Sequence, residues 1–284
     1  MQQAAGATDA LLGHVLAQSA SPRLAAAMRY AALGAGKRLR PFLVIESARL
    51  FNVPPARALR VGAALECVHC YSLIHDDLPA MDNDDMRRGK PTAHKQFDEA
   101  TAILAGDALL TLAFEILADG QTHPDANIRS ALVLELAKAS GKDGMAGGQM
   151  LDIEAEGAAA TALAAITRIQ SHKTGALFRF ACEAGAILAG ADAAPLRRYA
   201  DGIGLAFQIA DDLLDLQATP EQVGKATQKD GGKGKATFVS LMGAAAAKAK
   251  AGELVRDAIA ALEGYGAKAD ALRSAAQFIV ARKS

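Results

Sequence analysis

Carboxylates are crowded into one short stretch of the sequence, HDDLPAMDNDD, which runs from His75 to Asp85. The stretch directly follows the apolar run YSLI, residues 71–74, so its acids lie beside residues that should be buried. Like charges this close repel one another, and a bound cation would relieve the repulsion. Mg²⁺ prefers oxygen ligands and is usually held by a few carboxylates together with phosphate oxygens and water. The stretch is therefore either a solvated acidic loop or part of a magnesium site.

A second acidic group lies in FQIADDLLDL, residues 207–216. Asp211 and Asp215 are four residues apart and Gln208 lies three residues before Asp211, so all three share one helix face. Alone this pattern is weak evidence, because acidic helix faces are common. Two acidic groups, each following an apolar helical segment, could instead face each other across a helical bundle and hold metal ions between them.

Basic residues recur in several short clusters. GKRLRP contains Lys37, Arg38 and Arg40, and MRRGKP places Arg87 and Arg88 directly behind the first acidic run. Further lysines are Lys173 in HKTG, Lys225 in VGK, and Lys233 and Lys235 in KGKATF. Any one of these could be a surface charge, but together they suggest two bound anions, one clamped by metal and lysine and the other by arginine and lysine. Arginine forks suit diphosphate oxygens.

His69 and the cysteines allow two interpretations each. His69 lies two helical turns before Asp76 and shares its face, so an anion-binding role is as open as a structural one. The cysteines are Cys67, Cys70 and Cys182, an odd and low number that favours a reducing compartment. The CxxC at Cys67 and Cys70 favours buried apolar residues over redox or metal chemistry.

The elements that must position these residues are predicted to be helices. Alanine is abundant, β-branched residues are sparse, and apolar residues recur at spacings of three and four, with no convincing alternating strand. Prolines divide the chain into helix-length pieces. Because 51% of the residues are hydrophobic, we expect a single all-α domain over residues 1–284, with roughly ten or more helices around a central bundle.

The net charge and the apolar stretches indicate which compartment and partners to expect for the protein. The 31 basic and 31 acidic residues balance, which argues against a general polyanion-binding surface. The N-terminal residues do not resemble a signal peptide, and charged residues such as Asp107 interrupt the longest apolar stretches. We expect a cytoplasmic protein without stable membrane insertion or a nucleic-acid partner.

These motifs, taken in order, resemble those of the trans-isoprenyl diphosphate synthases, most closely the bacterial farnesyl diphosphate synthase type. DDLPAMD resembles the first Asp-rich motif of the family and DDLLD the second, while GKRLRP, RRGKPT, LAGDALL, GGQMLD, HKTG and FQIADD match further blocks. The resemblance extends from about residue 30 to about residue 242. It implies an isoprenoid-synthase helical fold and a homodimer.

The resemblance also implies roles for individual residues. The metal ligands would be Asp76, Asp77, Asp82, Asp211, Asp212 and Asp215, a set for three Mg²⁺ ions in each active site. Isopentenyl diphosphate would be bound by Lys37, Arg40, His69 and Arg88. The allylic diphosphate would be bound by Arg87, Lys173, Thr174, Gln208, Lys225 and Lys235, with Lys173, Thr174 and Gln208 also acting in catalysis. Arg38 is expected to be structural, and Asp84 to be a solvated neighbour.

The implied reaction is the Mg²⁺-dependent condensation of isopentenyl diphosphate with dimethylallyl or geranyl diphosphate, through an allylic carbocation. Tyr71 and Ser72 lie in the family's length-setting region, where an aromatic side chain would form the floor of a short pocket and favour a farnesyl product. The alternative is that Tyr71 is an ordinary core residue.

Several alternatives remain. Geranyl or geranylgeranyl diphosphate synthases belong to the same family. An HD-type metal phosphohydrolase is suggested by the pair His75–Asp76, but it leaves the second acidic motif unexplained. A terpene cyclase does not need a second diphosphate site, and a non-enzymatic relative would be expected to have degraded Asp-rich motifs.

Overall fold

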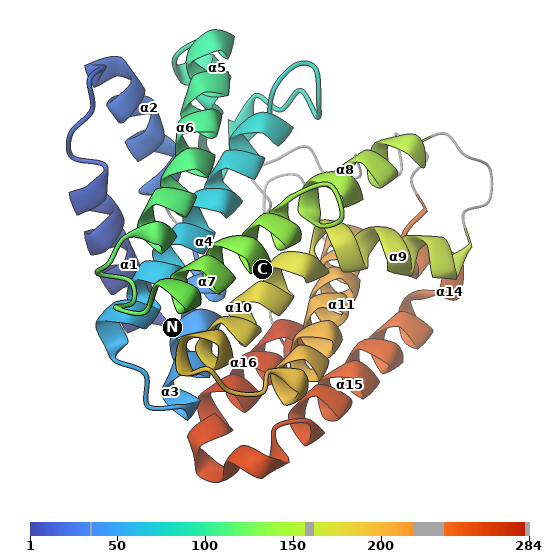
Figure 1. Cartoon of the computed structure of the whole chain (residues 1–284). Helices are drawn as coiled ribbons and strands as arrows, with labels where there is room; N and C mark the ends of the chain where they lie inside the picture. The colour runs from blue at the N-terminus through green and yellow to red at the C-terminus, as the bar shows by residue number, and fades with distance from the viewer. Residues whose placement is uncertain (35, 157–161, 218–235, 282–284) are drawn as a thin grey trace.

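The computed structural model describes residues 1–34, 36–156, 162–217 and 236–281, most of which are helical (Figure 1). The helices are α1 (Gln2–Val15), α2 (Pro22–Ala32), α3 (Leu39–Leu50), α4 (Pro55–Asp76), α5 (Ala93–Gln96), α6 (Glu99–Ala118), α7 (Ala126–Ser140), α8 (Met145–Glu154), α9 (Leu163–Lys173), α10 (Gly175–Ala189), α11 (Ala194–Gln217), α14 (Phe238–Met242), α15 (Ala244–Ala260), the 3₁₀ helix η1 (Glu263–Ala269) and α16 (Asp270–Ala281). The expected all-α fold is confirmed.

Side-chain caps begin several of these helices where the sequence changes character. The Ser21 hydroxyl accepts a hydrogen bond from the backbone N–H of Leu24, and Pro22 occupies the first helical position of α2. The Asp98 carboxylate accepts from the N–H of Thr101 at the start of α6. Short polar residues and prolines therefore set the helix boundaries here.

The centre of the bundle is formed by α4 and α10, which pack on each other and share α3 as a neighbour. On its other sides α10 packs against α7 and α11, and α4 packs against α6. Helix α15 lies along the outer side of α11 (Figure 1). Phe178 and Leu177 of α10 are almost fully buried, and a buried side chain of this size contributes about 1.5–3 kcal/mol to the hydrophobic free energy of folding.

Helix α6 is long and apolar enough to cross a membrane by length and composition, with a mean hydropathy of 1.7. Asp107 was expected to interrupt this apolar stretch, but the helix still meets the length and hydropathy criteria for a membrane span. In this structure Ala102, Gly106 and Leu109 are buried where α6 packs against α4 and α2. Only 39% of its most apolar window is buried, so α6 packs into the bundle along one side.

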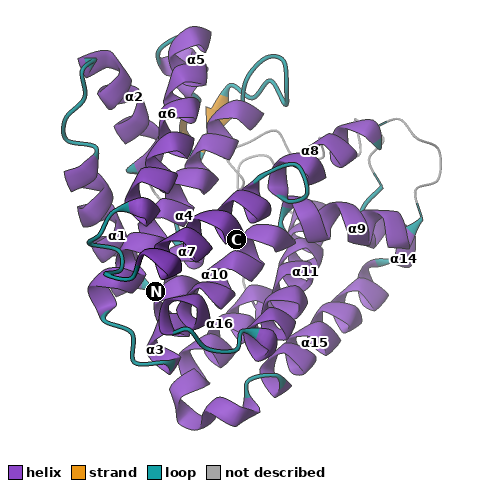
Figure 2. Ribbon diagram, viewed as in Figure 1, coloured by secondary structure: helices purple, strands orange, loops and turns teal. Residues whose placement is uncertain are grey.

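A short β-hairpin, which the sequence did not predict, connects the end of α4 to α5 (Figure 2). Its strands β1 (Met86–Arg87) and β2 (Lys90–Pro91) are antiparallel, with Arg87 opposite Lys90. Arg88 and Gly89 form the turn with φ angles of 52° and 75°, the positive values that a type I′ turn requires. Strands of two residues are too short to produce an alternating sequence pattern.

The cysteines are free and buried, as expected. Burial raises the pKa of the Cys70 thiol to about 12 and also raises the pKa values of Cys67 and Cys182. A thiol with a raised pKa is a poor nucleophile and a poor metal ligand. The cysteines therefore act as small core residues.

Candidate active site

Two cavities of about 420 Å³ each lie side by side in the bundle. We call the first the basic cavity, because Lys37, Arg40, His69, Arg87 and Arg88 are among the residues that line it. We call the second the apolar cavity; Tyr71, Ser72, Asp76, Met145, Met150, Lys173, Thr174 and Leu177 are among its lining residues. Arg40, His69 and Leu73 line both. Ligands in the two cavities would therefore meet across these three residues.

Arg38 anchors the segment that supplies Lys37 and Arg40. Its φ angle is 48°, which turns its side chain into the protein, where it is 2% exposed. The guanidinium forms ion pairs of 2.5 Å with Glu66 and 2.7 Å with Asp9. The expected structural role of Arg38 is confirmed. Lys37, Arg38 and Arg40 all line the basic cavity, so the anchored Arg38 fixes the segment that carries the other two.

Arg40 is a buried cation at the wall between the two cavities. Its guanidinium carbon lies 5.1 Å from the centre of the Phe178 ring, and its Nε atom has no hydrogen-bond partner among the described residues. Burial lowers its pKa, and the neighbouring Arg88 lowers it further, while Glu66 and Asp211 raise it. A buried donor without a partner is costly, so an anion in either cavity would stabilise Arg40.

His69 is held in its neutral form. Burial moves the pKa of its imidazole well below the usual value, and the charges of Arg40 and Arg88 lower it further. A neutral imidazole donates one hydrogen bond to an anion without requiring another buried charge. His69 thus adds specificity to the basic cavity, and its neighbours supply the charge.

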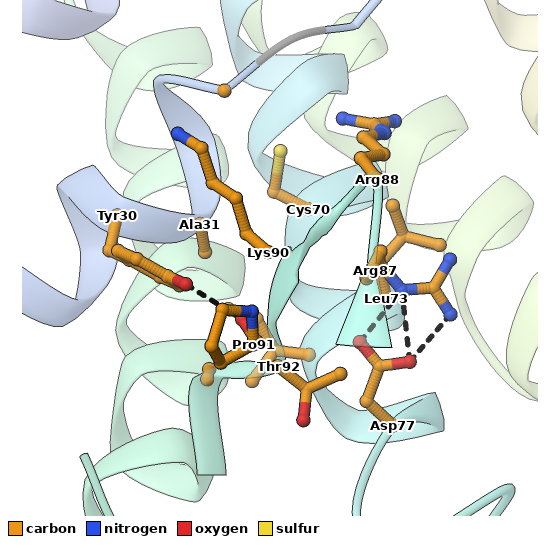
Figure 3. Close-up of a pocket in the computed structure, with 13 residues that line it drawn as sticks. Tyr30, Ala31, Cys70, Leu73, Asp77, Arg87, Arg88, Lys90, Pro91 and Thr92 are labelled. Carbon is orange, nitrogen blue, oxygen red and sulfur yellow. Dashed lines mark hydrogen bonds and ion pairs between the residues drawn. The ribbon is translucent and has the colours of Figure 1, made fainter. Parts of the chain in front are cut away.

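The side chain of Asp77 binds Arg87 (Figure 3). Arg87 Nε lies 2.9 and 2.7 Å from the two Asp77 oxygens, and Nη2 lies 2.6 Å from Oδ1. Arg88 points away from this pair, and both arginines also line the small cavity of about 70 Å³ drawn in Figure 3. Both Asp77 oxygens are engaged by a cation of the protein, so Asp77 is placed to orient Arg87.

The backbone folds the rest of the first acidic run back onto Asp76. The N–H of Asp82 donates to the Asp76 carbonyl at 2.8 Å, and that of Asp84 to the Asp77 carbonyl at 3.2 Å. Asp84 is only 7% exposed, so the expectation that it is solvated was wrong. Asp85 is exposed and pairs with Lys95 at 3.0 Å. The turn therefore groups Asp76 with Asp82 and directs Asp85 elsewhere.

The carboxyl group of Asp76 is suited to a cation. Burial raises its pKa to about 6; Lys173 opposes this shift, whereas the nearby Asp82 and Asp77 add to it. A divalent cation would offset both the burial and the repulsion. Among the residues that the structure describes, no group of three or more His, Cys, Asp or Glu side chains converges closely enough to hold a metal alone. Hard oxygen donors in small number fit Mg²⁺ that also binds the oxygens of a ligand.

The second acidic motif is connected to Thr174 by a chain of hydrogen bonds. The Thr174 hydroxyl donates to Gln208 Oε1 at 3.4 Å, and Gln208 Nε2 donates to Asp212 Oδ1 at 3.1 Å. Asp212 Oδ2 accepts from the backbone N–H of Phe238 at 2.8 Å. Asp212 thus holds the start of α14 against α11. The charge of Asp211 acts on Arg40, which lines both cavities.

Lys173, at the end of α9, forms an ion pair of 2.7 Å with Asp152 of α8. The two helices approach closely here, since a Cβ atom on Gly148 would lie 2.1 Å from the Lys173 backbone nitrogen. The ammonium group lines the apolar cavity near Asp76. One end of this cavity is therefore charged, and its remaining wall is mostly apolar.

Comparisons with known proteins agree with this arrangement. The sequence profile of the polyprenyl synthetase family matches residues 21–275. The chain belongs to this family. It is 48% identical over 264 residues to the farnesyl diphosphate synthase of Escherichia coli strain K12, covering 90% of this chain and 88% of the relative. The expected resemblance is confirmed.

Solved structures are similar over nearly the whole of this polyprenyl synthetase. An FPP/GFPP synthase from Zymomonas mobilis is 52% identical with a TM-score of 0.91, covering 98% of this chain and 97% of that structure. A geranyltransferase from Helicobacter pylori, solved with magnesium and isoprenyl diphosphate, is 32% identical with a TM-score of 0.80, covering 93% and 89%.

The polyprenyl synthetase brings most of its sequence-predicted residues to these two cavities. Lys37, Arg40, His69 and Arg88 line the basic cavity, and Tyr71, Ser72, Asp76, Lys173 and Thr174 line the apolar one. Lys225, Lys233 and Lys235 lie outside the described residues.

Three residues of the site were missed by reasoning from the sequence. Asp152 pairs with Lys173, Phe178 lies under Arg40, and Phe278 of α16 lies 5.8 Å from Lys37 Nζ. The block GGQMLD contains Asp152 and was the only signal for it. The two phenylalanines resemble any core residue until the fold places them.

Proposed function

We propose that this polyprenyl synthetase is a farnesyl diphosphate synthase. It joins isopentenyl diphosphate to dimethylallyl or geranyl diphosphate, head to tail, and releases diphosphate. The observation that supports this most directly is the pair of adjoining cavities. One is lined by arginine, lysine and histidine, and the other has an acidic and basic end followed by an apolar wall.

The basic cavity suits the diphosphate of isopentenyl diphosphate. Lys37, Arg40, His69 and Arg88 offer charge and hydrogen bonds there. This diphosphate has to stay attached during the reaction. Held without a metal, it does not receive the Lewis-acid activation that Mg²⁺ would give to a leaving group.

The allylic diphosphate belongs at the charged end of the apolar cavity. Mg²⁺ would be held there by Asp76, Asp82 and Asp211, with Asp215 nearby and three ions per site by family resemblance. When bound, Mg²⁺ supplies positive charge that offsets the charge of the leaving diphosphate. Lys173, Lys225 and Lys235 would bind the same group. Arg87 lines the neighbouring basic cavity, but its charge acts on Asp76, and it would reach the allylic diphosphate from that side. Asp77 and Asp212, named with the metal ligands, act here through Arg87 and Gln208.

The protein then controls the carbocation that ionisation leaves. Oxygen atoms of Thr174 and Gln208, held together by hydrogen bonding, stabilise positive charge without attacking it. The apolar walls exclude water, which would otherwise capture the cation. The alkene of isopentenyl diphosphate attacks across Arg40, His69 and Leu73, which line both cavities. The released diphosphate takes the proton that is lost.

The apolar cavity would receive the growing hydrocarbon tail. Tyr71 lies on α4 five residues before Asp76 and lines this cavity, so its ring stands where a lengthening tail would stop. This favours a fifteen-carbon product over the geranyl and geranylgeranyl alternatives. We also propose a cytoplasmic homodimer, with residues 1–284 forming one domain.

The HD-type phosphohydrolase gains no support from the site. His75 Nε2 lies 3.1 Å from the Ile103 carbonyl oxygen, a partner that occupies the nitrogen. The described residues also lack the cluster of metal-type side chains that such a site requires.

The purified protein should be incubated with isopentenyl diphosphate, Mg²⁺ and either dimethylallyl or geranyl diphosphate, followed by chain-length analysis. We expect farnesyl diphosphate from both primers and no product when a chelator replaces Mg²⁺. Asp76→Ala, checked for unchanged helical content by circular dichroism, should reduce turnover by orders of magnitude. No product from either primer would refute the proposed function.

A further inference from the structure

His75 lies where α4, α6 and the apolar cavity meet. Its side chain lines the cavity together with Tyr71 and Asp76. The Tyr71 and His75 rings are in edge-to-face contact, with centroids 5.7 Å apart and an interplanar angle of 79°. The two rings therefore form one continuous piece of wall, of which Tyr71 alone was expected from the sequence.

Contacts with α6 hold the His75 ring in this position. Nε2 lies 3.1 Å from the Ile103 carbonyl oxygen. Because a carbonyl oxygen only accepts, Nε2 carries the proton and donates it. Asp107 Oδ1 lies 3.9 Å from the same nitrogen. The ring is thus fastened to a helix that packs behind the cavity wall.

Gly106 of α6 provides the room for the ring. A Cβ atom at this position would lie 2.1 Å from Nε2 and 2.5 Å from Cδ2 of His75, far inside normal contact distance. Any larger residue would push the ring away from α6. The depth of the ring is therefore set by the absence of a side chain at residue 106.

We propose that His75 is a specificity-determining residue for product length, and that Gly106 positions it. The proposal rests on the proposed function, since it concerns the tail of the same product. An imidazole ring occupies about as much space as one isoprenyl unit. Its removal lengthens the space beside Tyr71, whereas its displacement from α6 moves it into the space that the tail needs.

Product length should therefore change in opposite directions in two variants. With isopentenyl and geranyl diphosphates, His75→Ala should shift the main product to one isoprenyl unit longer than that of the wild type. Gly106→Ala should shift it to shorter products, including geranyl diphosphate when dimethylallyl diphosphate is the primer. The double variant should return toward the wild-type distribution, because the new methyl then meets no ring and partly fills its space.

Gly120→Ala is the matched control, because a Cβ atom there would meet nothing within 4 Å; it should leave product length unchanged. Tyr71→Ala is the comparator for a lengthened pocket. Unchanged or longer products from folded Gly106→Ala would overturn the proposal, even if His75→Ala proved inactive. A wild-type protein that transfers no prenyl group would instead count against the proposed function.

Discussion

At the scale of single residues, the site keeps an arginine where the backbone disfavours one. Arg88 occupies the first turn position of the hairpin with a φ of 52°, a conformation that costs most side chains roughly 1 kcal/mol and suits asparagine or glycine. Arg88 also lines the basic cavity. A residue that conflicts with its local structure in this way is typical of a functional site.

Arg88→Asn should therefore weaken substrate binding and slightly stabilise the fold. We expect the melting temperature to rise slightly, because asparagine tolerates the turn, and KM for isopentenyl diphosphate to rise roughly tenfold or more through the lost charged contact. Asn52→Gly is a control at another left-handed position, with φ 56°, and should leave KM unchanged. A wild-type KM in Arg88→Asn would show that Arg88 does not bind isopentenyl diphosphate.

Asp76 and Asp77 are adjacent but should respond differently to substitution. Asp77 is bound by Arg87 through both oxygens, whereas Asp76 is grouped with Asp82. Asp76→Asn should raise the Mg²⁺ concentration needed for half-maximal activity, and Asp77→Asn should leave it nearly unchanged while raising KM for the allylic substrate. Magnesium titrations of both variants test this. Equal shifts in Mg²⁺ dependence for the two variants would show that Asp77 is a metal ligand as well.

The raised pKa of Asp76 has a consequence for stability. Burial raises the pKa of its carboxyl from the ordinary 3.8 to about 6 in the folded protein. Below both values it is protonated in both states and contributes nothing. Between pH 3.8 and about pH 6, the folded state binds more protons than the unfolded state, so the free energy of unfolding falls as pH rises. The full penalty, at most about 3 kcal/mol, is present above about pH 6.

Asp76→Asn should therefore be more stable than the wild type near pH 7.5 in metal-free buffer, and the difference should shrink toward pH 4. Urea unfolding at several pH values measures it. Adding saturating Mg²⁺ and diphosphate should reverse the order, because only the wild type binds them well. A pH-independent difference would mean that the carboxyl titrates normally.

At the scale of secondary-structure elements, α8 and α9 act as a unit around Lys173. The ion pair with Asp152 joins the two helices, and Gly148 lets them approach. The site therefore depends on helix packing as well as on its polar residues. A change in the distance between α8 and α9 would move the ammonium group without altering its chemistry.

Gly148→Ala should demonstrate this dependence. Its methyl group would lie 2.1 Å from the Lys173 nitrogen, a backbone atom that cannot swing aside. We expect a loss of about 1–3 kcal/mol of stability by urea unfolding and a drop in kcat larger than that of Asp152→Asn. Gly13→Ala, in α1 where a new methyl meets nothing within 4 Å, should be neutral or slightly stabilising. Normal kcat in Gly148→Ala would show that the approach of the helices is unimportant.

At the scale of the whole molecule, sequence reasoning succeeded where the signal was local. Helical periodicity and proline spacing predicted the all-α fold, and short motifs singled out Arg40, His69 and Asp76, which the structure places at the cavities. Sequence reasoning failed where tertiary packing determines the position of a side chain. The burial of Asp84 and the capture of Asp77 by Arg87 depend on a hairpin too short to leave a periodic pattern.

The two acidic motifs come from α4 and α11, so a ligand that joins them should stabilise the entire bundle. The carboxylates of the described residues do not form a complete metal site alone, and diphosphate alone would meet their negative charge. Mg²⁺ and diphosphate together should therefore raise the melting temperature by more than the sum of their separate effects. Ligand present at about a hundred times its Kd stabilises the folded state by roughly 2.7 kcal/mol. Differential scanning fluorimetry with each ligand and with both tests this, with Asp85→Asn as a control on the exposed carboxylate that pairs with Lys95. If Mg²⁺ alone produced the full shift, a protein-only metal site would have to exist, and the ligand oxygens would not be needed to complete it.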